Sequence, residues 1–210
     1  YSNSIISTNN VINNNISKTI FGILIIGPGN YITKNNVFDM LPGGYGGIEL
    51  SWSNNNIVSY NNIYKSGIGI DLYHSHSNSI INNFVRYNSN GINLLESSYN
   101  NIDSNNIIGR GYVYDVYGQG IIIGQNNSYN TKSNNTMTNL SYAALWLLNQ
   151  PGPDYKNNNN NITGNNISNN LDNGIVIGSI GIESNSFSSN VVCSNNQSKS
   201  NYYDIYNEGS

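Results

Sequence analysis

The chain contains 210 residues, of which 37% are hydrophobic and only 9% are charged, and its formal net charge is −3. Its eight Lys and Arg residues are scattered along the sequence, which argues against nucleic acid as a partner because phosphate binding needs a basic patch. No apolar run approaches the roughly 18 residues that a membrane-spanning helix requires, so no membrane span is predicted.

Three short apolar series recur along the whole chain, with a period of roughly 22 to 30 residues. Each member of the first series is the last residue of an Asn-x-apolar triplet. The series comprises Ile5, Ile32, Ile57, Ile80, Ile102, Ile162 and Phe187, with a degenerate copy at Lys132. The second series follows a few residues later and comprises Val11, Val37, Ile63, Phe84, Ile107, Met137, Ile167 and Val191. The third is a G-I-x-L motif, which starts at Gly22, Gly47, Gly69, Gly91, Gly120 and Gly174 and continues less cleanly from Ala144 and Asp204.

Each period therefore contains three short alternating segments separated by Asn, Gly and Ser, which predict three strands and three turns. We predict an all-β fold, a right-handed parallel β-helix (a solenoid) of about eight coils with three short strands in each. Residues 1–210 are expected to form one β-helix domain, with an irregular tail at 201–210.

Asparagine accounts for 47 residues, and one precedes nearly every member of the second series. Asparagine favours turns in general, but its recurrence at one phase of the repeat favours a more specific role. A buried carboxamide can donate to one neighbouring coil and accept from the other. We therefore expect an asparagine ladder along the solenoid.

Repeats of the form N-x-I-x-x-N-x-I followed by G-I-x-L resemble the parallel β-helix repeats of NosD-like (CASH) domains and of the wider pectate-lyase-like superfamily. The resemblance covers essentially the whole chain. It implies the fold but not one function, because the superfamily includes lyases, hydrolases, epimerases, phage tailspikes, adhesins and inert surface rods. It also implies that the G-I-x-L strand is the face on which the enzymes of this superfamily place their active sites.

On that strand the residue between the two apolar positions faces outward, and three consecutive copies are polar: Glu49, Asp71 and Asn93. Trp52, His74 and Glu96 follow three residues later in the same three copies. The candidate catalytic residues are Glu49, Asp71, Glu96 and His74. Two carboxylates on adjacent coils would be about 5 Å apart, the separation of a retaining glycosidase pair.

Glu49 and Asp71 are a candidate calcium site, because carboxylate oxygens are the usual ligands of Ca²⁺. No other metal site is predicted, since His74 and the nearby His76 lack a third ligand. No organic cofactor is expected.

Aromatic rings that stack on sugar faces are the usual means of binding glycans. A Tyr-rich loop between Gly109 and Gln119 lies near Arg86 and Tyr87 in the predicted repeat. The predicted glycan-binding residues are Trp52, Asn93, Arg86, Tyr87, Arg110, Tyr112, Tyr114 and Tyr117.

Seven N-x-[ST] sequons are candidate glycosylation sites, at Asn15, Asn126, Asn134, Asn139, Asn161, Asn166 and Asn196. Together with the low charge and the single cysteine, they favour an extracellular or cell-surface protein.

Two functions follow. The preferred one is a glycosylated extracellular structural protein that self-associates end to end into a filament, because no capping helix is recognisable at either end of the solenoid. The alternative is a carbohydrate-binding or carbohydrate-active module (lyase-, hydrolase- or epimerase-like) that binds polysaccharide on the outer G-I-x-L face. The scarcity of arginine and the absence of an Arg-rich strand favour a protein that is not an enzyme.

Overall fold

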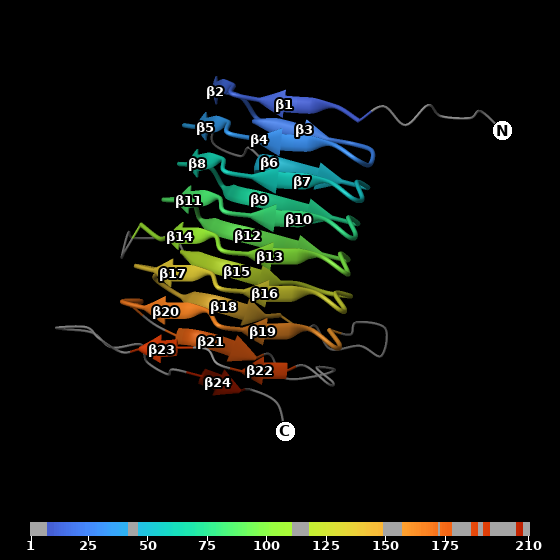
Figure 1. Ribbon diagram of the computed structural model, residues 1–210. Helices are drawn as coiled ribbons and strands as arrows, with labels where there is room; N and C mark the ends of the chain where they lie inside the picture. Colours follow the sequence, from blue (N-terminus) through green and yellow to red (C-terminus); the bar gives the residue numbers. More distant parts are fainter. Residues whose placement is uncertain are drawn as a thin grey trace.

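Every repeat folds into three strands because its apolar residues alternate over three to six positions between polar turns. The computed structural model describes residues 8–41, 46–110, 118–148, 157–171, 173–177, 186–188, 191–193 and 205–207. Within these residues the chain makes eight coils of three strands each, which stack along one axis (Figure 1). The predicted parallel β-helix of eight coils is therefore confirmed.

The strands form three eight-stranded parallel sheets, one for each position in the coil. Sheet A contains β1 (Asn10–Ile12), β4 (Tyr31–Thr33), β7 (Ile57–Ser59), β10 (Ser79–Ile81), β13 (Asn101–Asp103), β16 (Thr131–Ser133), β19 (Asn161–Thr163) and β22 (Ser186–Ser188). Sheet B contains β2 (Asn15–Ser17), β5 (Asn36–Phe38), β8 (Asn62–Tyr64), β11 (Phe84–Arg86), β14 (Asn106–Ile108), β17 (Thr136–Thr138), β20 (Asn166–Ser168) and β23 (Val191–Cys193).

Sheet C is built from the G-I-x-L motifs and has the longest strands. It contains β3 (Ile23–Ile25), β6 (Gly46–Ser51), β9 (Ile68–Tyr73), β12 (Asn90–Leu95), β15 (Gln119–Ile123), β18 (Ala143–Leu147), β21 (Asn173–Ile177) and β24 (Ile205–Asn207). The last strand, β24, pairs with β21 and lies inside the segment 201–210 that was predicted to be an irregular tail.

The pairing of the strands corrects the predicted inward positions of two coils. Val58 rather than Ile57 is the fully buried residue of β7, and Val85 rather than Phe84 is that of β11. In both strands two apolar residues are adjacent, so alternation alone does not choose between them. The register with the neighbouring coils decides, because a slip by one residue would turn every side chain to the other face.

The first and last coils also differ from the prediction. Val11 lies on sheet A and belongs to the first series, and Ile16 takes the second-series position of that coil. Val192 rather than Val191 is in register with the second series in the last coil. Ile5, the predicted first-series residue of the first coil, lies outside the described residues.

Two asparagine ladders cross the described coils, where one was predicted. The ladder before sheet A consists of Asn9, Asn30, Asn56, Asn78, Asn100, Asn130 and Asn160. The ladder between sheets A and B consists of Asn14, Asn35, Asn61, Asn83, Asn105, Asn135 and Asn165. Each ladder residue is two positions before an inward residue, which is apolar in every case except Lys132. The predicted asparagine ladder is confirmed, but in most coils its members lie one position earlier than predicted, because the residue immediately before an inward one, such as Asn106, faces outward.

Gly69 and Gly91 of the G-I-x-L motif lie where adjacent coils approach closely. A Cβ on Gly69 would lie 2.5 Å from the carbonyl oxygen of Gly91, and a Cβ on Gly91 would lie 2.5 Å from that of Gly120. These separations are shorter than any normal van der Waals contact. A side chain at Gly69 or Gly91 would therefore push the adjacent coils apart, whereas the sixth coil has Ala144 at the same position.

Lys132 is the one charged residue on the inner face of the described coils. It lies in register with Ile102 and Ile162 and its side chain is fully buried. Its Nζ donates a hydrogen bond of 3.2 Å to Oδ1 of Asn160. Burial lowers the pKa of Lys132 well below its ordinary value, because the apolar core disfavours the ammonium form.

Candidate functional site

The outer face of sheet C carries the column of residues that the sequence singled out. The middle residues of its strands are in register from coil to coil: Leu24, Glu49, Asp71, Asn93, Ile122, Trp146 and Val176. The three polar members lie on β6, β9 and β12 and are consecutive. Adjacent strands of a sheet are about 4.8 Å apart, so Glu49 and Asp71 are direct neighbours, as predicted.

Asn93 and Asp71 are joined by a hydrogen bond, in which the Asn93 Nδ2 donates to Oδ1 of Asp71 over 2.8 Å. Burial raises the pKa of Asp71, against the opposing effect of this hydrogen bond. Burial also raises the pKa of Glu49, and the negative charge of Asp71 raises it further. One oxygen of Glu49, Oε2, is buried without a hydrogen-bond partner. Among the described residues, the column therefore holds one buried carboxyl oxygen whose hydrogen bonding is unsatisfied.

A second row runs beside this column, where the strands of sheet C end. It consists of Trp52, His74 and Glu96, which adopt left-handed backbone conformations with φ of 51°, 46° and 50°. The same conformation recurs at the other corners of the coil, so it is a property of the fold and not of this site. The backbone amide of each row residue donates to a carbonyl of the next coil, which aligns the three side chains.

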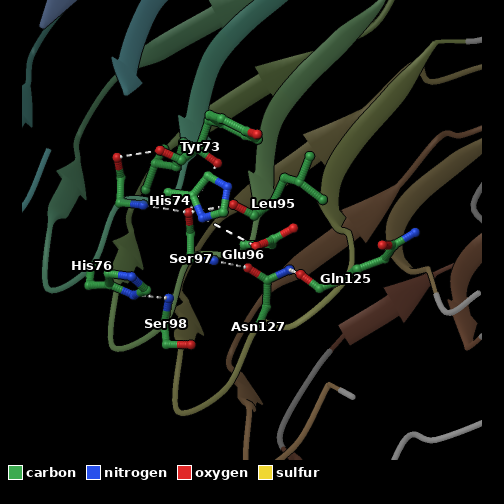
Figure 2. Close-up of polar contacts among 11 residues, drawn as sticks. Tyr73, His74, His76, Leu95, Glu96, Ser97, Ser98, Gln125 and Asn127 are labelled. Atoms are coloured by element: carbon green, nitrogen blue, oxygen red, sulfur yellow. Dashed lines mark hydrogen bonds and ion pairs between the residues drawn. The ribbon is translucent and has the colours of Figure 1, made fainter. Parts of the chain in front are cut away.

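The side chains of this row contact one another in order. The rings of Trp52 and His74 are stacked, with centroids 4.0 Å apart and planes 14° apart. At the edge of the imidazole ring, His74 Nδ1 lies 3.2 Å from Oε2 of Glu96 (Figure 2). Trp52 is 65% exposed, so one face of this stack is open to solvent.

Tyr73 is part of the site, although it was not among the predicted residues. It lies edge-on to both Trp52 and His74, with ring centroids 6.4 Å and 4.3 Å away, and it is 36% exposed. Two residues beyond Asp71 in the same strand, it occupies the next outward position. Strand alternation could have identified it, since it lies between the Asp71 column and the His74 row.

His76 is not part of the row formed by Trp52, His74 and Glu96. Its Nδ1 accepts a hydrogen bond of 3.0 Å from the backbone amide of Ser98 (Figure 2). The backbone amide of His76 donates to Oδ1 of Asn54. The described residues contain no group of three or more His, Cys, Asp or Glu side chains that could hold a metal ion. Calcium at Glu49 and Asp71 stays a prediction.

Arg86, Tyr87 and Arg110 form a separate cluster at the opposite end of β12. The guanidinium of Arg86 lies over the ring of Tyr64, 4.8 Å from its centroid, and Tyr64 in turn stacks on Phe38. Arg110 Nε donates to the carbonyl oxygen of Tyr87. This cluster covers sheet B and the corner after it, so the predicted glycan-binding residues fall into two groups. Tyr112, Tyr114 and Tyr117 lie outside the described residues.

The sequons lie on the surface wherever the structure describes them. Asn15, Asn134, Asn139, Asn161 and Asn166 are exposed and Asn126 is half-buried, and none of them belongs to a buried ladder. Asn196 lies outside the described residues. Their glycosylation stays a prediction.

Comparison with protein families gives one match, to the right-handed β-helix region, over residues 2–158. The chain belongs to the right-handed β-helix family. The match covers most of the chain and agrees with the three parallel sheets described above. It supports the coarse assignment that the repeat predicted and does not single out NosD-like proteins. No curated protein matches the sequence of this β-helix.

Solved structures resemble this β-helix in fold. A variant of the periplasmic alginate epimerase AlgG superposes with a TM-score of 0.68 at 19% identity, over 88% of this chain and 46% of the epimerase. Unaltered AlgG gives a TM-score of 0.63 at 20% identity, over 82% of this chain and 44% of the epimerase. An alginate lyase from Paenibacillus sp. str. FPU-7 gives 0.54 at 14% identity, over 89% of this chain and 76% of the lyase. The chain thus spans less than half of the epimerase.

No helix in the described part of this β-helix is long and apolar enough to cross a membrane.

Proposed function

We propose that this β-helix binds polysaccharide along the outer face of sheet C. The observation that carries the proposal is the exposed Trp52–His74 stack beside the polar column of Glu49, Asp71 and Asn93. An aromatic face can pack on the apolar face of a sugar ring, while carboxylates and carboxamides accept and donate hydrogen bonds to its hydroxyls. A regular column with one position per coil suits a linear polymer.

The fold comparisons support this proposal over a purely structural role. Two of the proteins that share the fold are carbohydrate-active, an alginate epimerase and an alginate lyase. The NosD-like assignment, extracellular or cell-surface location, glycosylation and end-to-end assembly into filaments are further proposals that rest on the sequence alone. Electron microscopy of concentrated protein that shows only single short rods would remove the filament proposal.

Replacing Trp52 with alanine is expected to weaken polysaccharide binding about tenfold, because the stacking surface is lost. Isothermal titration calorimetry or affinity electrophoresis would measure the change. Tyr60→Ala is a matched control, since Tyr60 is also a corner residue with positive φ and is 60% exposed, but lies between sheets A and B. Equal loss in both variants would count against binding at sheet C.

Turnover of the bound glycan is a second candidate function, favoured by the environment of Glu49 and Asp71. Glu49 Oε2 has no hydrogen-bond partner and its pKa is raised, which suits a proton donor. Burial also raises the pKa of Asp71, while the hydrogen bond from Asn93 partly offsets this effect and orients the Asp71 carboxyl group beside Glu49, so the two acids form a coupled pair.

If turnover occurs, we expect Glu49→Gln and Asp71→Asn each to lower its rate at least a hundredfold, since one proton transfer is lost in each. Release of new reducing or unsaturated chain ends would be measured. The surface acid Asp103, on sheet A, supplies the control Asp103→Asn. An unreactive wild-type protein that still binds glycan would leave binding as the function.

A further inference from the structure

We infer that the polysaccharide bound on sheet C is built from neutral sugars, and that polyuronates are disfavoured there. The inference rests on the proposed polysaccharide binding and names the class of its ligand. It is drawn from the charges and hydrogen-bonding groups of the face, which differ from what an anionic polymer requires.

The described site contains three acidic side chains and no lysine or arginine. Glu49 and Asp71 are adjacent in the central column, and Glu96 lies at the end of the second row. His74 is already placed against Glu96, 3.2 Å away, and against the ring of Trp52. A uronate carboxylate on this face would therefore meet like charges.

The lysines and arginines of the described coils lie elsewhere. Lys65 is at the corner between sheets B and C and forms an ion pair with Asp39. Lys132 is buried inside the solenoid. Arg86 and Arg110 belong to the cluster at the far end of β12, where Arg86 is engaged with aromatic rings and Arg110 with a backbone carbonyl. Lys18 and Lys34 are corner residues like Lys65, and none of these six lies on the outer face of sheet C.

The size of the expected discrimination follows from Coulomb's law. Two like charges about 5 Å apart at a protein surface repel enough to change an equilibrium constant roughly a hundredfold. The effect is reduced by salt, since the screening length at physiological ionic strength is about 8 Å.

Neutral sugars carry hydroxyl groups that can donate hydrogen bonds to the acids of the site. An ionised carboxylate at Glu49 or Glu96 only accepts hydrogen bonds, and a sugar hydroxyl can donate to it without bringing a charge. A hydroxyl donor also suits Asp71, whose carboxylate is acceptor-only when ionised. The same groups that repel a uronate are therefore suited to a hydroxyl-rich polymer.

One polymer in two chemical forms tests the inference. A polyuronate and its carboxyl-reduced derivative have the same linkages and length but differ in charge, and their affinities would be compared by calorimetry in a chelator at low salt. We expect the reduced form to bind at least tenfold more tightly, with a gap that narrows at high salt. Neutral glucans, mannans and xylans would be tested beside them, since linkage also affects binding.

Two further arms complete the experiment. The variant with Glu49→Gln and Asp71→Asn is expected to bind the native polyuronate more tightly, which would reduce the difference in affinity between the two polymers. Native polyuronate that binds as tightly as the reduced form, or more tightly once calcium is added, would overturn the inference while leaving polysaccharide binding intact. If no polymer binds, or if Trp52→Ala has no effect on binding, the proposed function itself fails and this inference falls with it.

Discussion

Replacing Lys132 with methionine is expected to raise the free energy of unfolding by about 2–4 kcal/mol near neutral pH. The side chain is fully buried in register with Ile102 and Ile162, and its one polar contact with the described residues is the 3.2 Å hydrogen bond to Asn160. Methionine has a similar length and fills the same space without an amine to desolvate. Urea denaturation followed by circular dichroism would measure the difference.

The stability of the wild-type protein should also depend on pH through Lys132. The unfolded chain holds this proton up to a pH of about 10.4, whereas the folded chain releases it at a lower pH because burial lowers the pKa. Between the two pKa values the unfolded state binds more protons, so stability rises with pH, by up to about 1.4 kcal/mol per unit. As the pH falls toward the pKa of Lys132 in the folded state, the destabilisation caused by burying its charged amine grows to its full size.

The Lys132→Met variant should lack this contribution to the pH dependence. Lys34→Met provides the control, because Lys34 is an exposed corner residue and its loss should leave the slope unchanged. Identical pH profiles for the wild type and Lys132→Met would show that the amine reaches solvent, contrary to the structure.

Replacing Asn105 with alanine is expected to lower the free energy of unfolding by about 2–4 kcal/mol. Its Nδ2 donates to Oδ1 of Asn135 and to the carbonyl oxygen of Ile80, and its Oδ1 accepts from the amide and the Nδ2 of Asn83. Alanine would leave these buried partners unsatisfied in the middle of the stack. The midpoint of urea denaturation would report the loss.

Asn106→Ala is the matched control for the ladder. Asn106 is the next residue, faces outward at the start of β14 and is exposed. Its replacement should change the free energy of unfolding by less than about 0.5 kcal/mol. A similar loss for both variants would mean that asparagine stabilises the corners through its turn preference and not through a buried ladder.

The sequence predicted the column of Glu49, Asp71 and Asn93 because its phase within G-I-x-L is unambiguous: each polar residue lies between two apolar ones. It did not predict that Trp52 stacks on His74 or that His74 contacts Glu96, because both contacts join residues 22 positions apart whose rotamers depend on the corner conformation. Strand alternation places Tyr73 at the outward position after Asp71, but its edge-on contacts with Trp52 and His74 depend on the same corner conformation.

The repeat alone determined the fold class and the number of coils, because a period with three apolar segments can bury its side chains only by stacking on its own copies. Only the tertiary structure decided the register at Ile57-Val58 and Phe84-Val85, where both residues are apolar and pairing with neighbouring coils selects one. It also placed two ladders where one was expected, and separated the Arg86 cluster from Trp52 by the length of a sheet C strand. Local alternation specifies which residues are apolar, whereas contacts between coils specify which side chains meet.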